Sequence, residues 1–250
     1  MVPMRPPLIE ELSFRPYDDL ALDIDRVVRS GRIGYVQAMD LTASDLIDLV
    51  TRIGPIFQPV ALPSDKELTQ ITVVRESGRI TSSANWHHDQ SFSPRPPDWS
   101  VLYCVDPGEL SVPTAFCDGA ALLSYLSPGL INTLSSLDAE HLAYYPEMGQ
   151  GPDDAIARQV HPVVRPVEGG LEALFVAPAT VRAFCGWTEF DSRPLLDFLY
   201  RMMNWPEMTV MHYWSKGDLL VWPNRRYPHR ALTLDAGGTR TLLRVVGHFD

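Results

Sequence analysis

Cysteine is scarce in this chain of 250 residues: there are three, and no two of them have the C-x-x-C spacing. A small, odd number of cysteines excludes a disulfide framework and disfavours a zinc site, so we expect reduced cysteines that act as small apolar fillers. The first seven residues lack the apolar run of a secretory signal, and no stretch approaches the roughly 18 apolar residues of a membrane span. These absences predict a cytoplasmic protein. The cysteines are Cys104, Cys117 and Cys185.

Basic side chains are also in short supply. The chain has 21 lysines and arginines against 31 aspartates and glutamates, which gives a formal net charge of −10. Nucleic acids and anionic membranes repel a negative surface, so neither is expected as a partner.

Internal repeats, low-complexity tracts and linkers are absent as well. The 22 prolines and 16 glycines are scattered along the chain, and 45% of the residues are hydrophobic, as in an ordinary globular protein. We therefore expect one domain over residues 1–250, with the proline-rich residues 1–17 as an arm lying over its body.

Apolar periodicity and capping residues predict the secondary structure. A helix is expected at 18–30 with Gly31 as its stop, and another after Thr42, which has capping-box spacing to Asp45. Distant strands surrounded by helices favour an antiparallel sandwich or barrel, and the lack of G-x-G-x-x-G or a P-loop disfavours a doubly wound parallel sheet. Further helices are expected at 119–126, 128–137 and 190–203, and strands at 33–39, 100–105, 163–165, 174–176, 208–213, 219–222 and 241–248.

The most informative segment is Trp86-His87-His88-Asp89. In an extended backbone His87 and Asp89 point to one face and His88 to the other. A second imidazole from His229 would complete a set of two histidines and one carboxylate, which holds one face of an octahedral Fe(II) and leaves three positions for cosubstrate and dioxygen. H-x-D alone also fits a surface loop or a hydrogen-bonded pair. His88 is expected in a supporting or surface position, and structural roles are expected for His141, His161, His212 and His248.

Two arginines follow His229. Asp235-Ala236-Gly237-Gly238 is a turn signal, after which the chain can return as a strand with Arg240 and Arg244 on one face. If that face looks inward, a buried guanidinium needs an anionic partner, which a dicarboxylate would supply in a bidentate pair. The alternative is a pair of surface arginines on an acidic protein.

Several blocks of the sequence together resemble the Fe(II)/2-oxoglutarate-dependent dioxygenases of the taurine dioxygenase group, in the family's order and over roughly residues 30–248. The resemblance implies a mainly β fold with flanking helices, a double-stranded β-helix or jelly roll. The blocks are Trp86-His87-His88-Asp89-Gln90-Ser91-Phe92 (W-H-x-D-x-x-F), Thr114-Ala115-Phe116-Cys117-Asp118 (T-x-F-x-D), Leu126-Ser127-Pro128, His161-Pro162-Val163-Val164-Arg165, and Gly217-Asp218-Leu219-Leu220-Val221-Trp222-Pro223-Asn224-Arg225 leading to His229-Arg230-Ala231.

The resemblance also implies roles for individual residues. His87, Asp89 and His229 match the iron ligands. Thr114 and Arg240 match the residues that hold the distal carboxylate of 2-oxoglutarate. Arg244 matches an arginine nearer the iron that contacts cosubstrate or substrate, and Phe92 an aromatic position lining the substrate pocket. Apart from the resemblance, we expect Gln90, Arg95, Trp99 and Tyr103 as further candidates for the substrate pocket.

The expected activity is oxidative decarboxylation of 2-oxoglutarate, with Fe(II) and O2, coupled to C–H oxidation of a small molecule, plausibly in specialised metabolism. Hydroxylation is the preferred outcome; desaturation and cyclisation start from the same oxidant. A homo-oligomer is left open. Two other classes stay open: a non-catalytic metal-binding jelly-roll protein, which Thr114 and Arg240 disfavour, and a zinc hydrolase with the same ligands, disfavoured because no H-E-x-x-H or similar helper is present.

Overall fold

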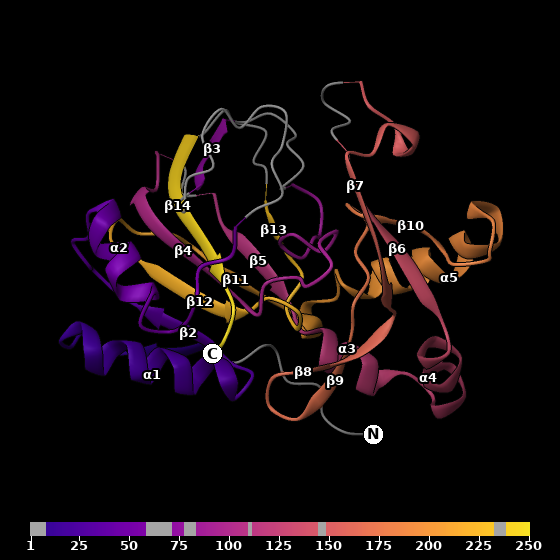
Figure 1. Ribbon diagram of the computed structural model, residues 1–250, viewed down its shortest axis with the longest axis horizontal. Coiled ribbons are helices and arrows are strands. Elements are labelled where there is room, and N and C mark those ends of the chain that lie inside the picture. The colour runs from indigo at the N-terminus through magenta and orange to yellow at the C-terminus, as the bar shows by residue number, and fades with distance from the viewer. Residues whose placement is uncertain (1–8, 59–71, 78–83, 110–111, 145–148, 233–238) are drawn as a thin grey trace.

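A computed structural model of the protein describes residues 9–58, 72–77, 84–109, 112–144, 149–232 and 239–250 (Figure 1). The expected turn at 235–238 and residues 1–8 of the expected arm lie outside the described residues. The helices are α1 (Tyr17–Arg29), α2 (Ala43–Val50), α3 (Gly119–Tyr125), α4 (Pro128–Ser135) and α5 (Glu189–Met202). The strands are β1 (Ile9–Leu12), β2 (Ile33–Val36), β3 (Thr72–Ser77), β4 (Trp99–Asp106), β5 (Thr114–Cys117), β6 (Asp138–Ala143), β7 (Ala157–Pro162), β8 (Val164–Val167), β9 (Leu171–Leu174), β10 (Val181–Phe184), β11 (Thr209–His212), β12 (Leu219–Pro223), β13 (His229–Ala231) and β14 (Thr239–Gly247).

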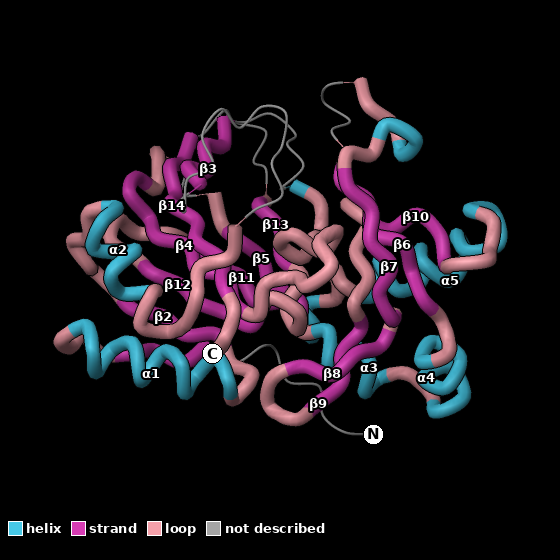
Figure 2. Tube along the Cα trace, viewed as in Figure 1, coloured by secondary structure: helices cyan, strands magenta, loops and turns pink. Residues whose placement is uncertain are grey.

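The largest sheet has the strand order β1-β2-β12-β4-β14-β3. Its pairs are antiparallel except β1 with β2, which is parallel. Helices α1 and α2 cover one face of this sheet, and Figure 2 shows them at its periphery. The core between helices and sheet is built from Leu20, Ile24, Leu46, Leu49, Trp99, Val101, Tyr103, Val221 and their neighbours.

The opposite face of the large sheet packs against a second sheet with the order β11-β5-β13. Phe116 of β5, Trp222 of β12 and Leu242 of β14 meet in the core between them. The other face of β5 contributes Ala115 and Cys117 to a third core, which lies under α3 and α5. The central strand β5 is therefore buried on both faces, and the space between the two sheets is where inward side chains meet.

A third sheet, β10-β6-β7, and the hairpin β8-β9 complete the strands (Figure 1). Helices α3, α4 and α5 lie beside them, and α5 packs on β10. None of the helices in the described part of the chain has the length and apolar character needed to cross a membrane.

The helix predictions are confirmed, and local chemistry explains their ends. Thr42 caps α2 with both halves of the expected capping box: its hydroxyl accepts from Asp45 N–H, and the Asp45 carboxylate accepts from Thr42 N–H. Gly31 follows α1 with φ +80°, and a Cβ there would lie 2.8 Å from the carbonyl oxygen of Glu168. The α2 helix ends at Val50, earlier than expected, and residues 51–53 form turns before Gly54.

The strand predictions are incomplete. Six strands outside the expected arm were missed: β3, β5, β6, β7, β10 and β13. Of these, β6 reads DAEHLA, a sequence poor in strand formers. Its strand state follows from pairing with β7 on one side and β10 on the other, which the local sequence cannot reveal. The expected strand at 174–176 is wrong, since β9 ends at Leu174. Part of the expected arm is instead an edge strand, β1.

Candidate metal centre

His87 and His229 stand side by side although 142 positions separate them (229 − 87 = 142). They form an isolated antiparallel bridge in which His87 N–H donates to the His229 carbonyl at 3.0 Å and His229 N–H donates to the His87 carbonyl at 2.9 Å. Residues directly opposite each other in an antiparallel pair project to the same face. The two imidazole centroids are accordingly 4.3 Å apart.

Asp89 completes a group of three. Its Oδ1 lies 4.0 Å from His87 Nε2 and its Oδ2 lies 3.7 Å from His229 Nε2. One ligand atom from each of the three residues lies within 4.8 Å of the others, close enough to hold a metal ion. We call His87, Asp89 and His229 the ligand trio. The structure thus brings together the three residues that the sequence predicts as iron ligands.

The charges in the trio suit a divalent cation. Burial opposes ionisation of Asp89, but the positive charge of Arg244 and the neighbouring histidines outweigh it and hold the pKa of this carboxyl below its usual range. Arg244 Nη1 donates to Asp89 Oδ1 and Ser100 Oγ donates to Asp89 Oδ2, both at 2.8 Å. Burial lowers the pKa of His229 to about 3, so its imidazole is neutral at ordinary pH. A carboxylate and a neutral imidazole are the forms that bind metal.

The imidazole tautomers are also those of metal ligands. His87 Nδ1 lies 2.9 Å from the Asn85 carbonyl oxygen, and His229 Nδ1 lies 3.5 Å from that of Tyr227. A carbonyl can only accept, so each Nδ1 carries the hydrogen and each Nε2 presents its lone pair toward Asp89. Two such nitrogens and one carboxylate are the donor set of non-haem Fe(II) sites with open positions. The residues present therefore fit Fe(II).

Asn224 fixes the backbone of the ligand segment, and sequence reasoning gave it no role. Its Oδ1 accepts from Asp89 N–H at 2.9 Å, and its Nδ2 donates to the Asp89 carbonyl at 2.9 Å and to the Pro97 carbonyl at 3.1 Å. The side chain is fully buried. This pairing replaces the strand partner that residues 88–90 lack, because only His87 of this segment forms a β-bridge. The one sequence signal for Asn224 was its position in the block 217–225, which belongs to the family resemblance.

Thr114 of β5 and Arg240 of β14 lie in the same interior as the trio. On β5, Phe116 pairs with His229 and Thr114 pairs with Ala231, so Thr114 is two residues, about 7 Å, from the position opposite His229. Arg240 Nη1 donates to Thr114 Oγ1 at 3.0 Å and to the Val112 carbonyl. Thr114 is 1% and Arg240 3% exposed. We call Thr114 and Arg240 the anchor pair.

The two arginines of β14 share an inward face, as their spacing predicts. Leu242 lies between them on that face and belongs to the core between the two sheets. Arg240 reaches Thr114 and Arg244 reaches Asp89. The alternative of two surface arginines is wrong, since Arg240 is buried and the Arg244 side chain is 27% exposed.

His88 faces away from the trio. Its Nδ1 donates to the Asn224 carbonyl at 2.8 Å, and its ring lies 4.5 Å from that of Phe175. His141 and His161 contact the same phenyl ring, at 5.0 and 5.5 Å. We call His88, His141 and His161 the Phe175 cluster. All three are buried, so His88 is a supporting residue and not a surface one.

The two remaining histidines have carboxylate partners. His212 Nε2 lies 3.0 Å from Asp218 Oδ2, and His248 Nδ1 lies 3.3 Å from Asp98 Oδ2. Neither belongs to a group of potential metal ligands among the residues the structure describes. Their geometry is that of structural histidines.

The expected substrate residues divide into two groups. Gln90 follows Asp89 with φ +52°, is 8% exposed, and its Oε1 has no hydrogen-bond partner within the described parts of the chain; Phe92 is half-buried. The expectation that Trp99 and Tyr103 line the substrate pocket is wrong. Both belong to the core under α1 and α2, on the far face of the large sheet. The alternation of β4 instead turns Ser100 toward Asp89. Arg95 pairs with Asp98.

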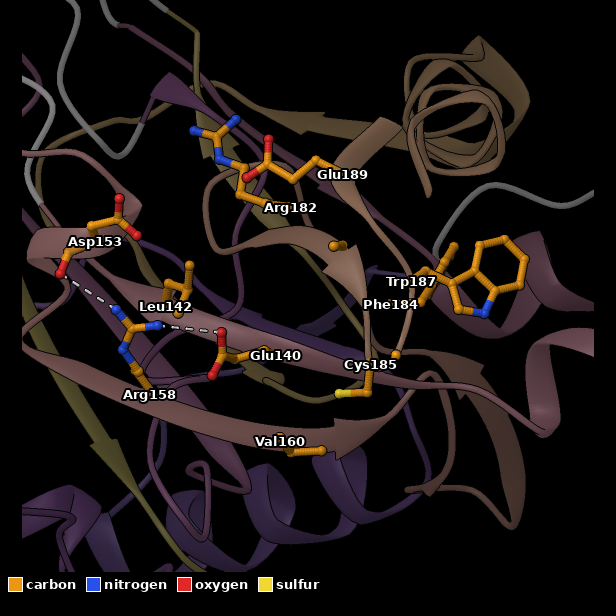
Figure 3. A pocket seen from close by; sticks show the side chains of 12 residues that line it. Glu140, Leu142, Asp153, Arg158, Val160, Arg182, Phe184, Cys185, Trp187 and Glu189 are labelled. Carbon is orange, nitrogen blue, oxygen red and sulfur yellow. Dashed lines mark hydrogen bonds and ion pairs between the residues drawn. The ribbon is translucent and has the colours of Figure 1, made fainter. Parts of the chain in front are cut away.

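A cavity of about 400 Å³ lies elsewhere, on the outer face of the sheet β10-β6-β7 (Figure 3). No member of the ligand trio or the anchor pair lines it. Its charged side chains have partners of their own: Arg158 Nη1 lies 3.5 Å from Glu140 Oε2, and Arg182 donates to the Tyr144 hydroxyl. The size of a cavity therefore does not locate the chemistry here.

Comparison with known proteins gives an independent result. Residues 10–246 match the family model described as "Taurine catabolism dioxygenase TauD, TfdA family". The chain is 28% identical over 215 residues to pentalenolactone F synthase of Streptomyces arenae, covering 76% of this chain and 72% of that protein. It is 31% identical over 168 residues to the alpha-ketoglutarate-dependent 2,4-dichlorophenoxyacetate dioxygenase of Cupriavidus pinatubonensis, covering 64% and 58%.

Among solved structures, the taurine dioxygenase from Burkholderia xenovorans superposes with a TM-score of 0.78 at 22% identity, covering 99% of this chain and 88% of that one. This likeness concerns the fold. The prediction of a mainly β fold with flanking helices, a double-stranded β-helix, is confirmed.

Proposed function

The chain belongs to the taurine catabolism dioxygenase TauD/TfdA family, and from that premise we propose that it hydroxylates a C–H bond of a small anionic molecule. It is an Fe(II)- and 2-oxoglutarate-dependent dioxygenase. The observation that carries the proposal is the ligand trio, within 4.8 Å, beside the buried anchor pair.

In this proposal His87, Asp89 and His229 hold Fe(II). When bound, Fe(II) with 2-oxoglutarate and O2 supplies the oxidising power, at the expense of decarboxylation of 2-oxoglutarate. The chain's own residues would orient the metal and the cosubstrate and shield them from water. Ser100 and Asn224 hold the side chain and the backbone of Asp89, so the carboxylate is preorganised.

The anchor pair receives the distal carboxylate of 2-oxoglutarate. Arg240 brings a buried positive charge, and Thr114 brings a hydroxyl 3.0 Å from it. Such a charge-assisted contact, out of water, favours a dicarboxylate over a 2-oxo acid that lacks the second carboxylate. Among the described residues, neither belongs to the group of potential metal ligands, which distinguishes this proposal from a protein that only binds metal.

Arg244 supports an anionic substrate. Its guanidinium is partly exposed and its charge is shared with Asp89, which a divalent cation would also neutralise. The arginine would then be available to a carboxylate or sulfonate on the substrate. Gln90, with a buried side-chain oxygen beside Asp89, and Phe92 are the further substrate contacts that we propose.

The relatives support a small-molecule substrate. One is named for the synthesis of pentalenolactone F and another for 2,4-dichlorophenoxyacetate, so specialised metabolism and small acids are both represented. We further propose that the protein acts in the cytoplasm, without nucleic acid or membrane as a partner, because its net charge of −10 repels both. A homo-oligomer is compatible with this proposal.

Two measurements test the proposal. Anaerobic addition of 2-oxoglutarate to the Fe(II)-loaded protein is expected to produce a weak visible charge-transfer band, which Arg240→Met abolishes at the same concentration. Succinate release is then screened across carboxylates, sulfonates and neutral analogues, and the product is weighed by mass spectrometry. A product that gains one oxygen atom supports hydroxylation; loss of two hydrogens would identify desaturation or cyclisation instead. Absence of the band with bound Fe(II) would contradict the dioxygenase proposal.

A further inference from the structure

The Thr114 hydroxyl receives two hydrogen bonds. Trp214 Nε1–H donates to Thr114 Oγ1 at 3.0 Å, and Arg240 Nη1–H donates to the same oxygen at 3.0 Å. Neither an indole nor a guanidinium can accept a hydrogen bond, so both directions are unambiguous. A hydroxyl has two lone pairs and one proton. With both lone pairs occupied, the hydroxyl can form one more hydrogen bond, by donating its proton. Among the described residues this proton meets no acceptor.

We propose that Trp214 is a positioning residue for the cosubstrate: its indole N–H commits the Thr114 proton to the distal carboxylate of 2-oxoglutarate. The inference rests on the proposed function, which assigns Thr114 and Arg240 to that carboxylate. Without the indole N–H, one lone pair of the hydroxyl is free. The hydroxyl then has a second orientation in which its proton turns away from the anion.

The surrounding loop holds the indole in place. Trp214 follows β11, is 2% exposed, and meets the ring of His212 edge-on at 4.7 Å. The Asp218 carboxylate accepts from Ser215 N–H at 2.7 Å and lies 3.0 Å from His212 Nε2. One carboxylate therefore contacts residues on both sides of Trp214 in the chain. Gly217 closes the turn with φ +85°, where a Cβ would lie 2.4 Å from the Met39 carbonyl oxygen. The segment is therefore built to fix the ring.

A simpler reading is that a buried indole needs an acceptor and Thr114 provides one. That reading predicts lost stability when the indole is replaced, and no effect that depends on the cosubstrate. A positioning role predicts an effect that appears only with a 2-oxo acid that carries the distal carboxylate. The two readings are separable by ligand choice.

The experiment compares wild type, Trp214→Phe, Thr114→Val and the double variant, each loaded with Mn(II). Calorimetry gives the Kd of 2-oxoglutarate and of 2-oxovalerate, which has a methyl group in place of the distal carboxylate. For 2-oxoglutarate, Trp214→Phe is expected to raise the Kd about three- to tenfold and Thr114→Val about tenfold or more. The double variant should be no worse than Thr114→Val, since Trp214 acts through the hydroxyl. No variant should change the Kd of 2-oxovalerate.

Trp99→Phe is the matched control. Trp99 is also buried and donates through Nε1 at 3.0 Å, to the His248 carbonyl, but it lies in the core under the helices. It should lower stability without changing either Kd. The inference is overturned if Trp214→Phe leaves the Kd of 2-oxoglutarate unchanged, raises both Kd values equally, or adds fully to Thr114→Val. If wild type itself binds the two acids equally, the anchor assignment in the proposed function fails first.

A second measurement needs no variant and covers the case in which Trp214→Phe does not fold. In the Zn(II)-loaded wild type, the indole N–H resonance of Trp214 is followed by NMR during titration. Donation from the Thr114 hydroxyl to an anion makes its oxygen a better acceptor, so 2-oxoglutarate should shift this resonance downfield. 2-Oxovalerate should not. An equal response to both acids would overturn the inference.

Discussion

Two groups of histidines, buried except for the partly exposed His87, lie on opposite sides of the segment 87–89. In the ligand trio, the Nδ1 atoms are held by backbone carbonyls and the Nε2 lone pairs converge on Asp89. In the Phe175 cluster, the rings pack around a phenyl group, and one nitrogen of His88 and of His161 is held by a carbonyl. That cluster has no carboxylate at a shared point among the described residues.

The difference shows what makes a histidine a ligand. Burial does not distinguish His88 from His229, because it lowers the pKa of each of these two to about 3. Only the trio combines nitrogen lone pairs aimed at one point with a negative charge, that of Asp89. Arg244 and the Ser100 hydroxyl hold this carboxylate in place. Convergence and charge, more than burial, separate a metal site from a packed core.

The largest expected effect would break the comparison outright. His229→Ala removes one of two nitrogen ligands and should weaken Mn(II) binding by more than about a hundredfold. His161→Gln, in the Phe175 cluster, should keep the affinity within about threefold. Calorimetry of the two metal-free variants with Mn(II) measures both. Equal losses would mean that the two groups do not differ as described.

Next in size is the loss of the anchor. Arg240→Met should weaken 2-oxoglutarate binding by about a hundredfold, because a buried charge-assisted contact is removed, while Mn(II) binding stays unchanged. Arg182→Met, which alters the outer cavity of Figure 3, is the matched control and should change neither affinity. A comparable loss in the control would place the cosubstrate in that cavity.

A smaller effect is expected at Ser100. Ser100→Ala removes the donor to Asp89 Oδ2 and should weaken Mn(II) binding about tenfold, since groups that orient a ligand carry part of its affinity. Ser100→Thr keeps the hydroxyl and should restore most of the affinity. If alanine at this position binds Mn(II) as tightly as wild type, Asp89 needs no such support.

The Phe175 cluster should show itself in stability against pH. Burial lowers the pKa of His141 well below its usual value and also lowers that of His161. Below about pH 6.5 the unfolded chain therefore binds more protons than the folded one, and stability falls as pH falls, by up to about 1.4 kcal/mol per pH unit for each histidine. Urea unfolding of the metal-free protein between pH 5 and 7 gives the slope, and His141→Gln should reduce it. An unreduced slope would contradict the assignment.

The sequence predicted the helices and the convergence of His87, Asp89 and His229 because their signals are local or tied to a pattern. The capping box at Thr42 and the H-x-D at 87–89 are each visible within a few residues. The inward face of β14 also followed from the even spacing of Arg240 and Arg244.

What the sequence could not reveal depends on contacts between distant residues. Residues 99–104 of β4 are all buried, so no alternation marks which of them face the metal, and Trp99 and Tyr103 were assigned to the wrong face. Asn224 meets Asp89 across 135 positions and Trp214 meets Thr114 across 100. Their roles follow from pairing in three dimensions, and nothing in their immediate neighbours indicates them.

The backbone bridge between His87 and His229 has a consequence for how a bound metal ion is exchanged. The two peptide hydrogen bonds join the backbones of the two segments that carry the imidazoles. We therefore expect a bound ion to exchange through side-chain movement alone, with no refolding of the 142-residue span. Chelation followed by dialysis against a fresh ion should regenerate the native centre, and substitute ions can be introduced the same way.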